Sequence, residues 1–213
     1  MTIETSAAAL IVRNIADIEA ALALAHELDD QIWEGVGSFL KERLPASWHV
    51  SEFDTVAGHV WFAPPEWQTH ENAETNANPY FTVEAIPGSN DEYDETYIAS
   101  FLGLGPNGSA IAVCFASSEL DKTRTRKALC NPTDARISTL LQAGVQLDAG
   151  SWLYLPVTLD SEQLSQAVQD EEYSEALEPL GNVLEILVAH VTTFAALVPQ
   201  VGADQLVTPL SKV

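Results

Sequence analysis

Three short apolar segments between residues 79 and 117 constrain the fold more than any other feature of the chain. They are YFTVEAI (residues 80–86), YIASFLGLG (97–105) and AIAVCFA (110–116), each bounded by glycine, proline or asparagine. Runs this apolar and this short are typical of strands in the core of a sheet. Pro106-Asn107-Gly108 suits a tight turn between two of them. We therefore expect a sheet here, with the rest of the chain covering it.

Helical patterns lie on both sides of this region. Apolar residues recur at helical spacing over residues 15–40, and Asn14 can cap that helix. A second helix is expected over about 162–178, capped by Asp160 or Ser161. A third, over 180–198, is apolar around so much of its surface that we expect it to be buried against the sheet.

Further strands are predicted outside the central region. Residues 50–56 and 59–63 read as a hairpin, and residues 151–159 as another strand, in which Pro156 indicates a sheet edge. Residues 1–12 fit a loose arm or an edge strand, and residues 199–213 an irregular tail.

This order of elements predicts one α+β domain over residues 1–213. We expect a mainly antiparallel sheet of about five or six strands, packed by an N-terminal helix and a long C-terminal helical segment. That order is too common to indicate a function by itself.

The charge balance narrows the choice of partner. The chain has 31 acidic and nine basic residues, giving a formal net charge of −22. Such a chain repels nucleic acids and anionic membranes and attracts basic proteins. The alternative is that the acidity only keeps the protein soluble.

Cysteine usage and apolar run lengths indicate the compartment. Cys114 lies inside an apolar run and Cys130 precedes Asn131-Pro132, so the two do not form a disulfide framework. The apolar patch at residues 7–12 is too short and wrongly flanked for a signal peptide. No apolar run approaches the length of a membrane span. We expect a cytoplasmic protein.

Acidic residues concentrate in two stretches that are candidates for binding a basic partner. One is the helical region near residue 170, and the other is a turn-rich loop over residues 87–95. Acidic blocks are also common on ordinary solvated faces, and that alternative stays open. The candidate residues are Asp170, Glu171, Glu172, Glu175, Glu178, Asp91, Glu92, Asp94 and Glu95.

Basic residues concentrate in one segment, residues 122–136, which holds five of the nine. Because the acidic blocks carry the opposite charge, this segment is a candidate for contact between copies of the chain. It predicts a possible homo-oligomer.

An aromatic and histidine-containing stretch, residues 48–70, is the other candidate site. A metal or acid–base site requires its polar side chains to converge, and no pair has the close spacing of a helical or zinc-finger site. The alternative is an ordinary surface lined by aromatic rings. The candidate residues are His49, His59, His70, Glu66 and Trp61.

Two hypotheses follow from these patterns. The first is a small acidic binding or inhibitory protein that docks a basic protein through its acidic face, as an immunity-type inhibitor or a mimic of nucleic-acid charge. Its basis is the charge together with the lack of a nucleophile, P-loop or other catalytic motif, which favours a protein that is not an enzyme and has no cofactor. The alternative is an enzyme or small-ligand-binding protein with its site in residues 48–70.

Overall fold

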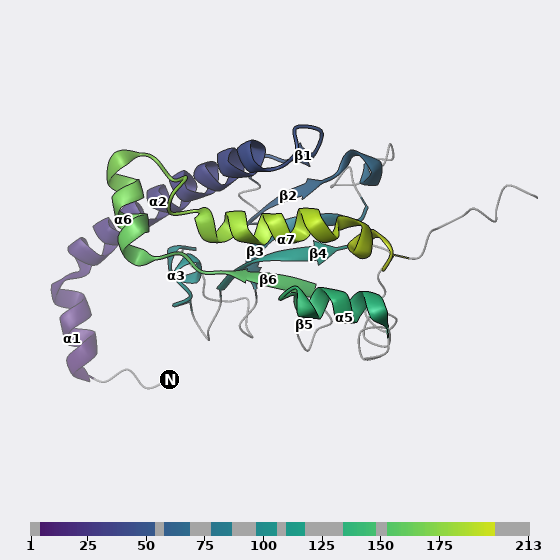
Figure 1. Cartoon of the computed structure of the whole chain (residues 1–213). Coiled ribbons are helices and arrows are strands. Elements are labelled where there is room, and N and C mark those ends of the chain that lie inside the picture. The colour runs from purple at the N-terminus through teal and green to yellow at the C-terminus, as the bar shows by residue number, and fades with distance from the viewer. Residues whose placement is uncertain are drawn as a thin grey trace, which may run out of the picture.

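The computed structural model describes residues 5–53, 58–68, 78–86, 97–105, 110–117, 134–147 and 153–198. These residues form helices and one sheet (Figure 1). The helices are α1 (Thr5–Arg13), α2 (Ile15–Arg43), the 3-10 turn η1 (Pro65–Trp67), α3 (Ile98–Phe101), α5 (Ala135–Gln142), α6 (Ser161–Asp170) and α7 (Glu178–Ala195). The strands are β1 (His49–Val50), β2 (His59–Ala63), β3 (Tyr80–Ile86), β4 (Ala110–Ala116), β5 (Gln146–Leu147) and β6 (Leu153–Val157).

The sheet is antiparallel throughout, in the order β1-β2-β3-β4-β6-β5. Its centre is the long β3–β4 pair, in which Phe81 lies opposite Phe115 and Val83 opposite Val113. The prediction of an α+β fold with an antiparallel sheet is confirmed, and β3 and β4 coincide with two of the three segments that suggested it.

Helix α7 covers one face of the sheet (Figure 1). Phe194 is 1% exposed, and its ring lies 5.1 Å from that of Phe81 and 5.0 Å from that of Phe115. The helix is only partly enclosed, because Val188 on its outer side is exposed. Full burial, which the sequence favoured, is therefore wrong, although the packing against the sheet is as expected.

Helix α2 buries its second half against the same core. Ile32, Val36 and Phe39 are buried at helical spacing, whereas most residues before Asp29 are exposed. Asn14 does not cap this helix: its side chain donates instead to the carbonyl oxygen of Leu10, 2.8 Å away, at the end of the preceding helix. Residues 5–12, for which an arm or an edge strand was expected, are helical.

The segment after residue 97 is a short helix, α3, and not the third central strand that its apolar run predicted. The carboxylate of Asp29 on α2 accepts a hydrogen bond of 2.8 Å from the backbone N–H of Tyr97, at the start of this turn. Gly103 then ends it with a positive φ of 67°, which favours glycine. Short apolar runs do not distinguish a strand from a buried helical turn.

The C-terminal helices are divided differently from the prediction. Asp160 caps α6 as expected, accepting from the N–H groups of Glu162 and Gln163 at 3.0 Å. The helix ends at Asp170, because Glu171 adopts a left-handed conformation with φ 54°. Residues 171–177 form a connection before α7, where one helix was expected to continue to 178.

Strand β6 is not the edge of the sheet, since β5 lies beyond it. However, β5 pairs only with Leu153 and Tyr154, so Pro156 lies past its end. The missing N–H of Pro156 therefore leaves no gap in the β5–β6 ladder. Among the described helices, none is both long and apolar enough to cross a membrane.

Candidate functional site

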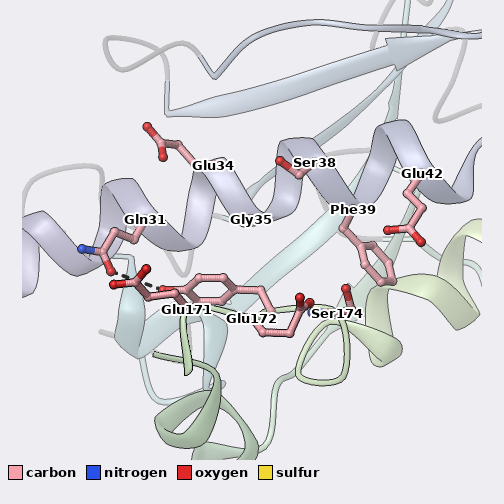
Figure 2. Close-up of a pocket in the computed structure, with 10 residues that line it drawn as sticks. Gln31, Glu34, Gly35, Ser38, Phe39, Glu42, Glu171, Glu172 and Ser174 are labelled. Atoms are coloured by element: carbon pink, nitrogen blue, oxygen red, sulfur yellow. Dashed lines mark hydrogen bonds between the residues drawn. The ribbon is translucent and has the colours of Figure 1, made fainter. Parts of the chain in front are cut away.

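A groove of about 570 Å³ lies between α2 and the 171–177 connection (Figure 2). We call it the acidic groove, because four of its lining side chains are glutamates that come from both sides. It is lined by Gln31, Glu34, Gly35, Ser38, Phe39 and Glu42 of α2, and by Glu171, Glu172, Tyr173 and Ser174 of the connection.

The α2 side of the groove follows from helical spacing. Gln31, Ser38 and Glu42 recur at intervals of seven and four residues, which places them along one face of the helix. Among the described residues, none donates a side-chain hydrogen bond to Glu34 or Glu42. Figure 2 shows the Glu42 side chain on the side of α2 that faces the connection, near Phe39, and the Glu34 side chain pointing the other way, at the margin of the groove.

Tyr173 packs directly on α2 at Gly35. A Cβ atom at position 35 would lie 2.9 Å from Cγ of Tyr173, so a glycine is needed for this close approach. The Tyr173 hydroxyl donates to Oε1 of Gln31 at 3.4 Å. Burial, with a smaller contribution from the charge of Glu171, raises the pKa of Tyr173, so its hydroxyl stays protonated at neutral pH.

The connection is held by its own hydrogen bonds. The carboxylate of Glu172 accepts from the backbone N–H of Ser174 at 3.1 Å. Hydrogen bonds from the side chain and then the backbone of Ser174 lower the pKa of Glu172, which keeps this carboxylate ionised. Glu171, in its left-handed conformation, turns the chain from α6 into the groove wall.

One basic residue of the chain, Arg43, lies beside the groove. Arg43 forms an ion pair with Glu178, the first residue of α7. Its guanidinium also lies 5.0 Å from the centre of the Phe39 ring. Stacking on a ring while pairing with a carboxylate is a favourable combination for a guanidinium group.

The acidic groove thus combines carboxylates on two walls with the rings of Phe39 and Tyr173. Carboxylates accept hydrogen bonds from guanidinium and ammonium groups, and the rings can contact the apolar stems of arginine and lysine. This chemistry suits the binding of basic side chains.

The structure gathers only part of the acidic residues that the sequence singled out. Glu171 and Glu172 line the groove, and Asp170 and Glu175 are exposed next to it. Glu178 forms an ion pair with Arg43. The other predicted acidic cluster, Asp91, Glu92, Asp94 and Glu95, lies outside the described residues, as does most of the basic segment 122–136.

The sequence analysis missed Glu34 and Glu42, which complete the groove from the α2 side. They lie about 130 positions before the connection, so no local pattern joins them to it. One signal was available: Gly35 in the middle of a helical pattern indicates a close approach of another segment.

The histidine stretch does not converge on one site. The ring of His49 packs on that of Trp61 at a tilt of 32°, with ring centres 4.7 Å apart. His59 pairs in register with Glu84 of β3 and not with His49. Glu66 borders α7 near Val191, and Trp61 is largely buried. His70 lies outside the described residues.

His59 belongs instead to a polar patch on the sheet face opposite α7. Its cross-strand partner Glu84 accepts a hydrogen bond from Cys114, and burial is the main cause that raises the pKa of Glu84. Within the part of the chain that is described, no three His, Cys, Asp or Glu residues are grouped so that they could hold a metal ion.

Comparison of the chain with protein-family models, with curated proteins and with solved structures finds no match.

Proposed function

We propose that the chain is an acidic binding or inhibitory protein that docks a basic segment of a partner protein in the acidic groove. One observation carries the proposal: carboxylates from two distant parts of the sequence line a groove that also holds two aromatic rings. An acidic face that served only solubility would not need an aromatic surface between its carboxylates.

The contacts of Arg43 support arginine as the residue of the partner that the groove prefers to bind. Its guanidinium stacks on Phe39 and pairs with Glu178, so the chain itself contains the contact that we propose for the partner. An incoming arginine would reach the ring of Tyr173 and the carboxylates of Glu171 and Glu172. Arginine can bind a carboxylate through two parallel hydrogen bonds, which lysine cannot do.

The net charge supports a partner that arrives by electrostatic steering. A charge of −22 attracts a basic protein at long range. At 0.1 M ionic strength, salt screens this attraction beyond about 10 Å. An immunity-type inhibitor of a basic toxin, or a mimic of nucleic-acid charge, uses this physics. Association should therefore be fast at low salt and slower as salt is added.

Affinity capture tests the proposal. Tagged protein is incubated at low salt with lysate of its own source, washed with a salt gradient, and the eluted proteins are identified by mass. A parallel bait carries Glu34→Gln, Glu42→Gln, Glu171→Gln and Glu172→Gln. We expect a basic protein that the native bait retains and the groove variant loses. Retention of the same proteins by both baits would contradict the proposal.

A second candidate function, a small-ligand-binding protein or enzyme, is supported by the polar patch around His59. Oε1 of Glu84 and Oγ1 of Thr82 are buried and hydrogen-bond to no described group. Buried polar atoms usually have a partner, and a ligand can supply one. Metal analysis of the purified protein is a discriminator for this candidate: a stoichiometric metal that Glu84→Gln abolishes would support it, and a metal-free protein would count against a metal site.

A further inference from the structure

We infer that the partner segment bound in the acidic groove also carries an apolar residue, which occupies a second groove next to the first. This second groove has a volume of about 500 Å³ and lies between the end of α2 and one side of α7. We call it the apolar groove, because most of its lining residues are apolar. Its lining includes Arg43 and Leu44 at the end of α2, and Gly181, Leu184, Val188 and Ala189 of α7. The inference rests on the proposed function, because it describes a further part of the same partner.

The apolar groove combines buried and exposed apolar side chains. Leu44 and Leu184 are 5% and 2% exposed, whereas Val188 is 36% exposed. Gly181, Leu184 and Val188 recur at intervals of three and four residues, which places them along one face of α7. An aliphatic side chain in the groove would remove apolar surface of Val188 from water, which is favourable. The groove therefore suits an aliphatic residue of a partner, such as leucine.

The two grooves meet where α2 packs against α7. Phe39 lines the acidic groove and Gly181 lines the apolar groove, and a Cβ atom at position 181 would lie 3.2 Å from Cζ of Phe39. Glu42 lines the acidic groove, and Arg43, the next residue of α2, lines the apolar groove. One continuous segment of a partner can therefore contact both grooves.

The charges of the lining residues differ between the two grooves. Among the described residues that line the acidic groove, four are glutamates and none is basic. The apolar groove has one residue of each sign, Arg43 and Glu185. Arg43 forms its ion pair with Glu178 beside this boundary, and its positive charge disfavours an arginine or lysine on the apolar side. The basic residues of the partner are therefore favoured in the acidic groove, and an apolar residue is favoured beyond it.

Continuity with the acidic groove is what indicates this occupant, because an exposed valine by itself indicates no partner. The apolar groove directly extends a surface whose charge is complementary to a basic segment. Once arginines hold that segment, placing a neighbouring side chain costs little further loss of translational freedom. We therefore expect the apolar residue to strengthen the binding of a basic segment.

Fluorescence anisotropy with designed peptides tests the inference at fixed salt. Each labelled peptide has six arginines, a glycine spacer and two leucines or, in the matched peptide, two serines. The spacer length and the order of the parts are varied. For the best arrangement we expect the leucine peptide to bind about tenfold more tightly than its serine counterpart.

The outcomes separate this inference from the proposed function. If the serine peptides bind and leucine gives no advantage in any arrangement, the inference is overturned and the proposed function stands. If none of the peptides binds, the proposed function fails and the inference fails with it.

Substitutions locate the leucine contact. In Val188→Gln/Ala189→Gln, both at exposed positions, the ratio of the serine to the leucine dissociation constant should fall below about threefold. Leu10→Gln/Leu141→Gln is the matched control, because these side chains are 61% and 47% exposed and line neither groove. Its ratio should stay at about tenfold. An undiminished ratio in the first variant, or an equal fall in the control, would overturn the inference.

Photo-crosslinking of the native chain gives a second readout. A photoreactive leucine analogue replaces one leucine of the best-binding peptide, and the crosslinked residues are identified by mass spectrometry. We expect crosslinks to residues 43–45 and 181–189. Crosslinks confined to other segments of the chain would overturn the inference.

Discussion

Tyr173 lies against Gly35 so closely that a Cβ atom at position 35 would come within 2.9 Å of its Cγ and 3.1 Å of its Cβ and Cδ2. A glycine within a helix destabilises it by about 1 kcal/mol relative to alanine. Glycine at position 35 therefore lowers the stability of α2 by itself, but it is necessary for the packing of Tyr173 in the groove wall. The contact connects two segments that supply carboxylates to the same site.

Gly35→Ala is expected to destabilise the protein by about 1–2 kcal/mol, because the clash with Tyr173 outweighs the gain in helix propensity. Gly37→Ala provides the control, since a Cβ there meets nothing within 4 Å. That variant should be more stable than the native chain by up to about 1 kcal/mol. Urea unfolding measures both, and stabilisation by both substitutions would show that Tyr173 does not pack on α2.

Reversal of charge at the connection should slow association with a basic ligand. For Asp170→Lys/Glu171→Lys/Glu172→Lys we expect about tenfold slower binding of a six-arginine peptide at low salt in stopped-flow fluorescence. Glu19→Lys/Glu66→Lys/Glu162→Lys changes the net charge equally but away from the groove. If this control slows association as much, the rate depends on net charge alone.

Stability should depend on pH through Asp29. Burial raises the pKa of Asp29 above 3.8, against hydrogen bonds from Tyr97 and Ile98 and the charge of His26, while Asp30 adds to the rise. The folded state therefore binds this proton more tightly than the unfolded state. As pH rises from near 3.8 through the folded-state pKa, this carboxyl makes the folded protein progressively less stable.

Asp29→Asn removes this titration and keeps an oxygen that can accept from the Tyr97 N–H. The stability of the variant relative to the native chain should therefore increase with pH over that window and then level off. Urea unfolding at a series of pH values measures the difference. A difference that shrinks as pH rises would contradict the assignment.

Phe194 anchors α7 to the sheet, so Phe194→Ala should lower the free energy of unfolding by about 3–5 kcal/mol. Val188→Ala, an exposed position on the same helix, should lower it by less than about 1 kcal/mol. Thermal or urea denaturation compares the two. Equal effects would mean that α7 does not use the Phe194 face for packing.

The sheet was predictable where a strand is apolar and its ends carry turn residues, as in β3 and β4. The cap at Asp160 was also predictable, because it depends on residues two and three positions away. The segment at residues 97–102 was not, since its helical turn is capped by Asp29, 68 positions earlier in the chain. Local patterns do not report such long-range contacts.

The candidate site was half predictable for the same reason. Glu171 and Glu172 belong to an acidic block that composition alone reveals. Their position in the groove wall depends on the left-handed conformation of Glu171. This conformation is uncommon for a residue other than glycine, so the sequence does not predict it. Glu34 and Glu42 join the site only through the packing of Tyr173 on α2.

The most direct measurement of the central claim is the dissociation constant of a labelled six-arginine peptide, determined by fluorescence anisotropy at fixed salt. Glu34→Gln/Glu172→Gln removes one carboxylate from each wall, and Glu66→Gln/Glu162→Gln removes the same charge elsewhere. We predict at least about tenfold weaker binding for the first variant and less than about threefold for the second. Equal weakening by both variants would show that the peptide senses only net charge, and the groove would lose its role as a docking site.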